Sequence, residues 1–320
     1  MPNGLRDRAR HADRIDAVVI VAPAVLERLQ NIEVARVDIF RFDGHPPAPV
    51  GQLRRGGIAA RLVLVRELAQ QLTVMWDTMH RECRKLGITV VTGHTGRYEN
   101  CHYPMVGGAT MVGVGEMDEY VTPRFARAGD KIIITKGPAI EATGLFGVTF
   151  PGRIEKALGT DMARRAAGVF GQMSVVQDCR IAAAIGVRNR GVTSMHDATE
   201  CGLYGGLVEV AQASGVGMRI EKEAIPVPEV VSRVCGHFGI DPFTSISEGT
   251  LIVTCKPFRA QALLAAFSGV SIPAAIIGEV IGKERGIVLV EGGAERELRH
   301  PRLDPFWAAF GEAMAASRRV

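Results

Sequence analysis

Residues 195–203 read MHDATECGL, and a β-strand is predicted directly before them, at residues 191–195 (GVTSM). His196 and Asp197 then stand at the tip of this strand, and residues 202–213 carry apolar side chains at helical spacing. Strand, loop and helix in this order place polar groups at the carboxyl edge of a sheet, where α/β proteins bind ligands. The stretch therefore predicts an α/β fold with a ligand site at this edge.

A carboxylate and a hydroxyl, Asp197 and Thr199, precede the helix that begins at Gly202. Such oxygen groups suit a hard cation such as Mg²⁺ and the phosphates that accompany it. The alternative interpretation is that both side chains only cap the helix.

Two further strand ends carry polar groups. Residues 92–96 read TGHTG after the β-branched run 88–91, and their glycines allow backbone amides to turn toward an anion. A strand is predicted at residues 131–135, with Thr135 at its end and Lys136 and Gly137 directly after it, and the lysine has the length to reach a phosphate. An ordinary polar turn and a solvated lysine are the alternatives.

The rest of the chain alternates between helical and strand patterns, which favours mixed α/β layers. A long amphipathic helix is predicted from Glu67 to Leu86, with Gly87 ending it, and residues 104–115 predict a second strand group. Residues 121–130 have the composition of a linker, so we expect domains at 1–122 and 123–320. Further predicted helices cover residues 153–169, 174–185 and 259–267, and further strands cover 249–255, 275–281 and 286–291.

Composition agrees with a cytoplasmic two-domain enzyme. The 320 residues are 47% hydrophobic and 22% charged, with a formal net charge of +4 that is spread along the chain. This small charge does not indicate nucleic acid as a partner, and no apolar run is long enough to span a bilayer. The six cysteines lack the paired spacing of structural zinc sites, so we expect reduced thiols.

Common nucleotide-binding signatures are absent. Residues 278–284 resemble a phosphate-binding loop but have one residue too few between the glycines, and Glu284 replaces the hydroxyl that would hold Mg²⁺. We interpret Gly282 and Lys283 as a hairpin turn. Residues 113–118 lack the third glycine of a dinucleotide-binding fingerprint, and no Gly-x-Ser-x-Gly elbow occurs.

Five stretches in this order resemble the superfamily of aminoimidazole ribonucleotide synthetase (PurM-like), which includes thiamine-monophosphate kinase, selenophosphate synthetase and the HypE-like hydrogenase maturation proteins. The matching stretches are residues 92–95, 132–143 (IIITKGPAIEAT), 195–203, 245–251 (SISEGTL) and 277–290. The resemblance implies an α/β (α+β) two-domain fold. The amino-terminal sheet would pair with that of a second subunit to form a dimeric barrel, and the larger carboxyl-terminal domain would be mixed α/β.

The resemblance also implies ATP, Mg²⁺ and phosphoryl transfer to an oxygen of a small substrate. It implies that the metal is bound by Asp16, Asp38 and Asp197. The residues that would act in catalysis are Asp197, His94 and Lys136. The residues that would bind the nucleotide are Gly93, Thr95, Glu141, His196 and Thr199. ATP would lie at the junction of the dimer and the domains, and the partners would be a small-molecule substrate and a second copy of the chain.

Departures from the family pattern lie near the amino terminus and near the last residues. The family has Asn-Asp where this chain has Gly56 and Gly57, which removes an expected metal ligand. Residues 317–320 (SRRV) offer no cysteine to carry a carbamoyl group, so we expect a non-standard HypE-like protein. The first cysteine, Cys83, stands too late for a selenophosphate synthetase. The two hypotheses are therefore an ATP-dependent enzyme and a non-catalytic nucleotide-binding or assembly protein that kept the fold.

Overall fold

The computed structural model describes residues 55–93 and 109–317. The contacts within the chain divide it into two units, before and after the bond between Gly115 and Glu116. The domain boundary predicted between residues 122 and 123 stays a prediction.

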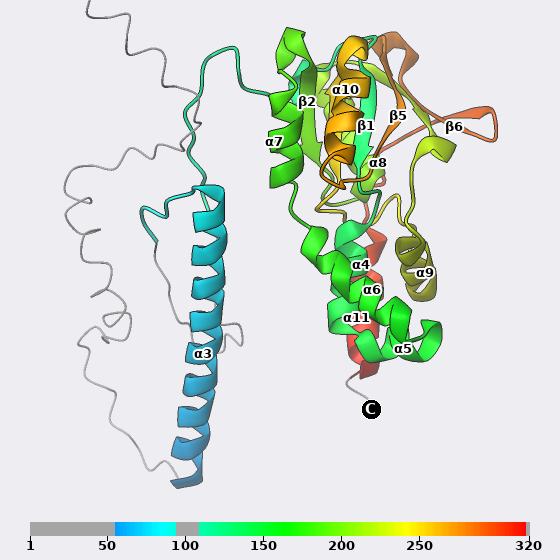
Figure 1. Ribbon diagram of the computed structural model, residues 1–320. Helices are drawn as coiled ribbons and strands as arrows, with labels where there is room; N and C mark the ends of the chain where they lie inside the picture. The colour runs from blue at the N-terminus through cyan, green and yellow to red at the C-terminus, as the bar shows by residue number, and fades with distance from the viewer. Residues whose placement is uncertain (1–54, 94–108, 318–320) are drawn as a thin grey trace, which may run out of the picture. The chain divides into compact units, whose positions relative to one another are not determined.

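The first unit contains the long helix α3, Arg55–Leu86 (Figure 1). The predicted amphipathic helix is confirmed, and it begins earlier than Glu67 because residues 58–66 are rich in the good helix formers Ala, Leu and Arg. Gly87, with φ +71°, ends it. The amide of Ile88 donates to the carbonyl of Cys83 at 2.8 Å, as in a Schellman cap.

The strands predicted in the first unit are not found among its described residues. Residues 88–93 and 109–115 have no strand assignment. A β-branched run forms a strand only when a neighbouring backbone pairs with it, and no described residue pairs with this one. The dimeric barrel therefore stays a prediction.

The second unit is built on a seven-stranded mixed sheet with the order β2-β4-β1-β5-β3-β6-β7. Only the β3–β6 pair is parallel among these strands, and all other neighbours are antiparallel. The strands are β1 (Lys131–Thr135), β2 (Val192–Asp197), β3 (Gly217–Glu221), β4 (Leu251–Cys255), β5 (Ala274–Ile281), β6 (Ile287–Glu291) and β7 (Ala294–Glu297).

Helices cover both faces of the sheet and one end of it (Figure 1). Residues of α7 and α10 pack on the face of Ile133, and residues of α8 pack on the face of Ile132 and Ile134, because side chains alternate along β1. The remaining α-helices of this unit share a third core around Phe146. The bounds are α4 (Ile140–Thr149), α5 (Pro151–Leu158), α6 (Thr160–Val169), α7 (Val176–Ala184), α8 (Gly202–Ser214), α9 (Glu229–Phe238), α10 (Pro257–Ser268) and α11 (Pro305–Ser317). Short 3-10 turns are η1 (Pro123–Phe125), η2 (Phe170–Gln172), η3 (Arg188–Arg190), η4 (Lys222–Ala224) and η5 (Lys283–Arg285).

The prediction of a linker at residues 121–130 is wrong for residues 125–130, which are fixed by contacts with the second unit. Asp130 is 1% exposed and accepts hydrogen bonds from Thr193 Oγ1 at 2.7 Å and Lys256 Nζ at 2.8 Å. The guanidinium of Arg188 lies 3.5 Å from the ring centroid of Phe125. Composition indicated a linker, but buried polar and aromatic contacts fix this segment to the second unit.

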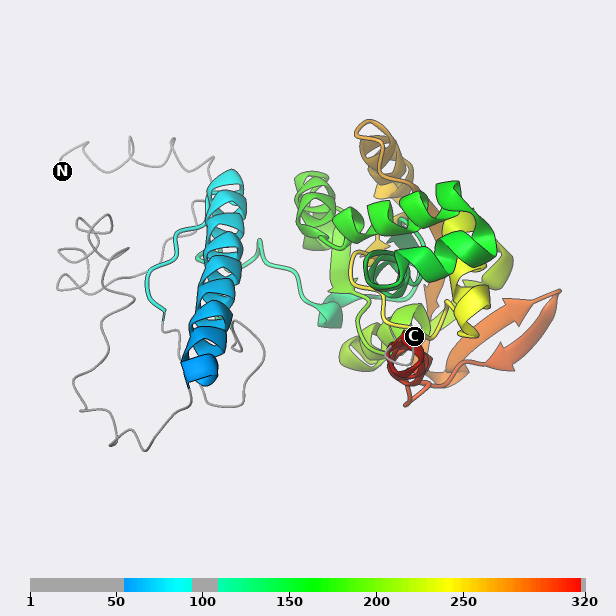
Figure 2. The ribbon, with the colours of Figure 1, turned by 90° about the horizontal axis from the view of Figure 1, so that it is seen from below.

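Two other predictions need correction. Gly282 and Lys283 do not form a hairpin turn, because β3 lies between β5 and β6 in the sheet and η5 makes the connection. The single helix predicted at 153–169 is two helices, since Gly159 adopts φ +92° between α5 and α6. Figure 2 shows the true hairpin, β6–β7, extending from the edge of the second unit. In the described part of the chain, no helix has the length and apolarity needed to cross a membrane.

Candidate functional site

Three of the family stretches meet at one edge of the sheet. Strand β4 lies between β1 and β2 and is antiparallel to both, with Asp197 paired to Leu251 and Ile134 paired to Ile252. The ends of β1 and β2 therefore lie beside the start of β4. This register brings the segments 135–143, 196–203 and 245–251 together.

Lys136 directly follows β1 at this edge, and only 8% of its side chain is exposed. Its Nζ donates to the carbonyls of Gly249 at 2.8 Å, Ser174 at 3.0 Å and Gln172 at 3.2 Å, and it lies 3.1 Å from Asp178 Oδ2. An ammonium group has only three N–H bonds to donate, so these acceptors use all of them. The contacts favour a role in positioning the loops, and the predicted catalytic role stays a prediction.

Glu141 joins the first turn of α4 to the segment 245–251. Its Oε2 accepts a hydrogen bond from the amide of Glu248 at 3.1 Å. Ser247 Oγ contacts Thr250 Oγ1 at 2.7 Å and accepts from the amide of Ile140 at 3.3 Å. Side chains of one family stretch thus satisfy backbone groups of another, which holds both in a fixed relation.

Several carboxyl groups gather here, and burial shifts their titration. Burial raises the pKa of Glu141 from 4.5 to about 7. The hydrogen bond from the Glu248 amide opposes this rise, and the charges of Glu248, Glu200 and Asp304 add to it. The pKa of Glu248 is also raised, by burial and by the charges of Asp197 and Glu200. Carboxyl groups with raised pKa values are suited to proton transfer near neutral pH.

The two ends of the imidazole of His196 have different surroundings. Its Nε2 lies 2.7 Å from Glu209 Oε2 on α8, and its Nδ1 lies 3.9 Å from Asp197 Oδ1. His300 Nε2 lies 3.8 Å from the other oxygen of Glu209. Glu209 therefore orients His196 beside Asp197, whose side chain is 46% exposed.

Replacing Glu141 with glutamine tests whether the raised pKa of Glu141 makes the free energy of unfolding depend on pH. Because the pKa of Glu141 in the folded state lies above 4.5, the folded protein binds more protons between pH 4.5 and 7, and its stability falls as pH rises through this window. We expect Glu141→Gln to remove this loss and to stabilise the protein at pH 8 by about 1 kcal/mol, a discounted value because the carboxyl is half exposed. Urea unfolding at pH 4 and pH 8 measures it, and an equal effect at both pH values would contradict the assignment.

Gly249 has no room for a side chain. Its φ is +103°, and a Cβ atom would lie 2.5 Å from the carbonyl oxygen of Gln172. We expect Gly249→Ala to lower the free energy of unfolding by about 2 kcal/mol or more.

Gly236 provides a matched control for this prediction. It lies on α9 with open space around it, so Gly236→Ala should stabilise the helix by about 0.5–1 kcal/mol. Chemical denaturation of both variants is the measurement, and equal stability of the two would show that the segment is not closely packed.

Other predicted site residues have varied placements. Thr199 is half-buried, and its carbonyl accepts from the amide of Gly202 at 3.0 Å. Gly93 is exposed in the first unit. The predicted residues Asp16, Asp38, His94 and Thr95 lie outside the described residues.

Asp197 is the predicted metal ligand that the structure describes. Among residues 55–93 and 109–317, no three His, Cys, Asp or Glu side chains are close enough to hold a metal ion. Mg²⁺ is typically bound by one or two carboxylates together with phosphates and water, so the exposed Asp197 fits part of such a site.

Sequence reasoning missed three residues that shape this edge. Asp178 on α7 and Glu209 on α8 hold Lys136 and His196, and Asp304 accepts a hydrogen bond from the amide of Cys201 at 2.7 Å. All three lie outside the family stretches. Only their position on neighbouring elements, which the fold reveals, brings them to the site.

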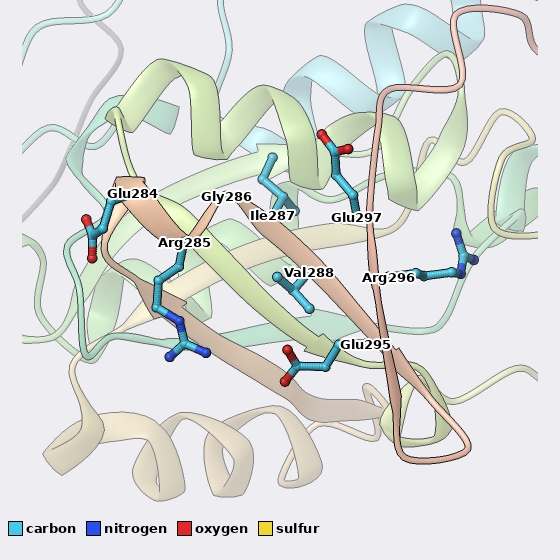
Figure 3. Close-up of a pocket in the computed structure, with 8 residues that line it drawn as sticks. All are labelled: Glu284, Arg285, Gly286, Ile287, Val288, Glu295, Arg296 and Glu297. Carbon is cyan, nitrogen blue, oxygen red and sulfur yellow. The ribbon is translucent and has the colours of Figure 1, made fainter.

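A groove of about 350 Å³ lies at η5 and the β6–β7 hairpin (Figure 3), at the opposite end of the strand order from β2. It is open and lined by both charges, including Arg285, Glu295 and Arg296. None of the predicted site residues lines it. The groove is therefore separate from the candidate site.

Comparison with known proteins gives a consistent family. The family model described as AIR synthase related protein, C-terminal domain, matches residues 127–291, more than half of the 320 residues. Carbamoyl dehydratase HypE of Azotobacter vinelandii is 30% identical over 219 residues, which cover 67% of this chain and 60% of that protein. The same enzyme of Rhodobacter capsulatus is 34% identical over 230 residues, covering 68% and 62%.

A solved structure of Escherichia coli HypE, described as a hydrogenase maturation protein, has a TM-score of 0.54 and 23% identity, covering 74% of this chain and 70% of that one. This likeness supports the fold. The chain matches about 60% of the length of the curated relatives. The protein belongs to the AIR synthase-related (PurM-like) superfamily, and the relatives named above are HypE proteins.

Proposed function

We propose that the protein is an ATP- and Mg²⁺-dependent enzyme that activates an oxygen of a small substrate by phosphoryl transfer. The observation that carries the proposal is the convergence of three family stretches at one edge of the sheet. There the charge of Asp197 acts on the carboxyl group of Glu248, whose amide donates to Glu141. In phosphoryl transfer the protein mainly positions the reactants and neutralises charge. Asp197 would hold Mg²⁺ there, and His196 would contact the nucleotide.

The names of the relatives suggest which oxygen is activated. Proteins called carbamoyl dehydratase remove water from a carbamoyl group. Transfer of the terminal phosphoryl group of ATP to the carbamoyl oxygen would make phosphate the leaving group. The nitrogen would then lose two protons as the carbon–oxygen bond breaks and the nitrile forms, and carboxylates are suitable proton acceptors.

Residues outside the second unit would complete the site. The resemblance implies that Asp16, Asp38, His94 and Thr95 contribute metal and phosphate contacts and that the amino-terminal sheet pairs with that of a second copy. A homodimer with ATP at the junction of the domains is thus part of the proposal.

A second candidate is a non-catalytic nucleotide-binding or assembly protein. It is favoured by Gly56 and Gly57, which stand where the family has Asn-Asp and which lie in the first turn of α3. A protein of this kind would bind nucleotide without turning it over.

Turnover of ATP separates the two candidates. We expect the purified protein with Mg²⁺ and ATP to form ADP when a small carbamoyl compound is added, and we expect Asp197→Asn to lower this rate by about 100-fold or more. Asp161→Asn, which removes an exposed ion pair with Arg164 on α6, should leave the rate unchanged. Nucleotide binding without ADP formation would favour the second candidate, and equal rates for both variants would contradict the role of Asp197.

A further inference from the structure

We propose that Asp178 is a positioning residue that acts with Lys136 to hold the segment 245–251, so that the backbone of Glu248 stays against the carboxyl group of Glu141. Asp178 lies on α7, outside every stretch that resembles the family. The inference rests on the proposed function, because it concerns carboxyl groups of the same site.

The carboxylate of Asp178 is buried and uses both oxygens. Its side chain is 2% exposed, Oδ1 accepts from Thr135 Oγ1 at 2.6 Å, and Oδ2 lies 3.1 Å from Lys136 Nζ. Thr135 and Lys136 are consecutive residues at the end of β1. One carboxylate therefore fixes both side chains at the point where the strand meets the site.

Thr135 and Lys136 then hold the segment that carries Glu248. Thr135 Oγ1 accepts a hydrogen bond from the amide of Leu251 at 3.2 Å, and Lys136 Nζ donates to the carbonyl of Gly249 at 2.8 Å. These contacts lie one and three residues after Glu248, whose own amide donates to Glu141 Oε2. A chain of contacts thus leads from Asp178 to Glu141 through the backbone of residues 248–251.

Stability alone is a poor explanation for this buried pair. The cost of removing two charges from water largely offsets their attraction, so a well-packed apolar pair of similar volume is often at least as stable. The contacts described above connect Asp178 to Glu141 through Thr135, Lys136 and the backbone of the segment 248–251.

The experiment compares Asp178→Asn and the double variant Asp178→Asn/Lys136→Gln with the wild type. Asp161→Asn is the control, since Asp161 is an exposed aspartate on α6. The first readout is the titration of the Glu141 carboxyl carbon by NMR, with the signal assigned from its loss in Glu141→Gln. The second is kcat and KM for ADP formation from Mg²⁺ and ATP.

We expect both Asp178 variants to lower the titration midpoint of Glu141 by about one pH unit, because a released segment exposes its carboxyl group to water. Loss of the hydrogen bond from the Glu248 amide acts in the opposite direction, but burial is the larger of the two effects on the pKa of Glu141. The double variant leaves the net charge of the pair unchanged, so its shift reports position rather than charge. We also expect kcat to fall by about 10-fold or more while KM changes by less than about 3-fold.

An unchanged titration midpoint of Glu141 in the folded double variant would overturn the proposal. A midpoint that shifts in Asp178→Asn but returns to the wild-type value in the double variant would also overturn it, because the shift would then report charge and not position. The double variant carries the test if Asp178→Asn does not fold, because it leaves no lone buried charge. If the wild type does not turn over ATP, the proposed function fails, while the titration still decides whether Asp178 positions the segment.

Discussion

Replacing Phe146 with alanine is expected to lower the free energy of unfolding by about 3–5 kcal/mol. Phe146 is fully buried on α4, its ring stacks on that of Phe238 at 3.8 Å between centroids, and the ring of Phe306 lies 5.0 Å away. Truncation would remove these contacts and leave a cavity between α4, α9 and α11, because close packing prevents the helices from collapsing into it.

Urea unfolding of Phe146→Ala measures this effect, with Phe258→Ala as the matched control. Phe258 lies on α10 and is 69% exposed, so its loss should change the free energy of unfolding by less than about 0.5 kcal/mol. Equal stabilities of the two variants would contradict the helical core around Phe146.

Replacing Asp130 with alanine is expected to destabilise the protein by about 3–5 kcal/mol, because it leaves a cation without its partner. The carboxylate binds Lys256 Nζ through Oδ1 at 2.8 Å, and its Oδ2 accepts from Thr193 Oγ1 and from the amide of Arg127. Lys256 is itself only 21% exposed, so water replaces the lost carboxylate poorly.

Chemical denaturation of Asp130→Ala and Asp161→Ala compares a buried and an exposed ion pair. Asp161 and its partner Arg164 are 61% and 81% exposed, and such pairs contribute about 0–1 kcal/mol. A small effect of Asp130→Ala would restore the interpretation of residues 121–130 as a linker.

Most of the carboxyl-terminal unit was predictable from the sequence where periodicity was strong. The strand at 131–135 and the helix at 202–213 were predicted close to their observed bounds, since apolar patterning and a leading glycine mark them. Strand β3 was missed because its sequence, GMRIE, is short and carries two charges. The hairpin predicted at Gly282 was wrong because turn residues do not reveal that β3 inserts between β5 and β6.

The candidate site was predictable only in part, for a topological reason. Asp197 and Lys136 stand in recognisable stretches at strand ends, and the sheet order brings these ends together. The contacts that occupy Lys136 come from Asp178 and from carbonyls of residues 172, 174 and 249, which no local pattern connects to it. Sequence spacing indicates which side chains can reach an edge, whereas their partners depend on the packing of distant segments.

The most direct test of the account is calorimetric titration of the protein with a non-hydrolysable ATP analogue, with and without Mg²⁺, for the wild type and Asp197→Ala. We predict that the wild type binds the ATP analogue only with Mg²⁺ and that Asp197→Ala abolishes this binding. Asp161→Ala should bind the analogue as the wild type does. Absence of binding by the folded wild type, or binding that neither Mg²⁺ nor Asp197 affects, would contradict it.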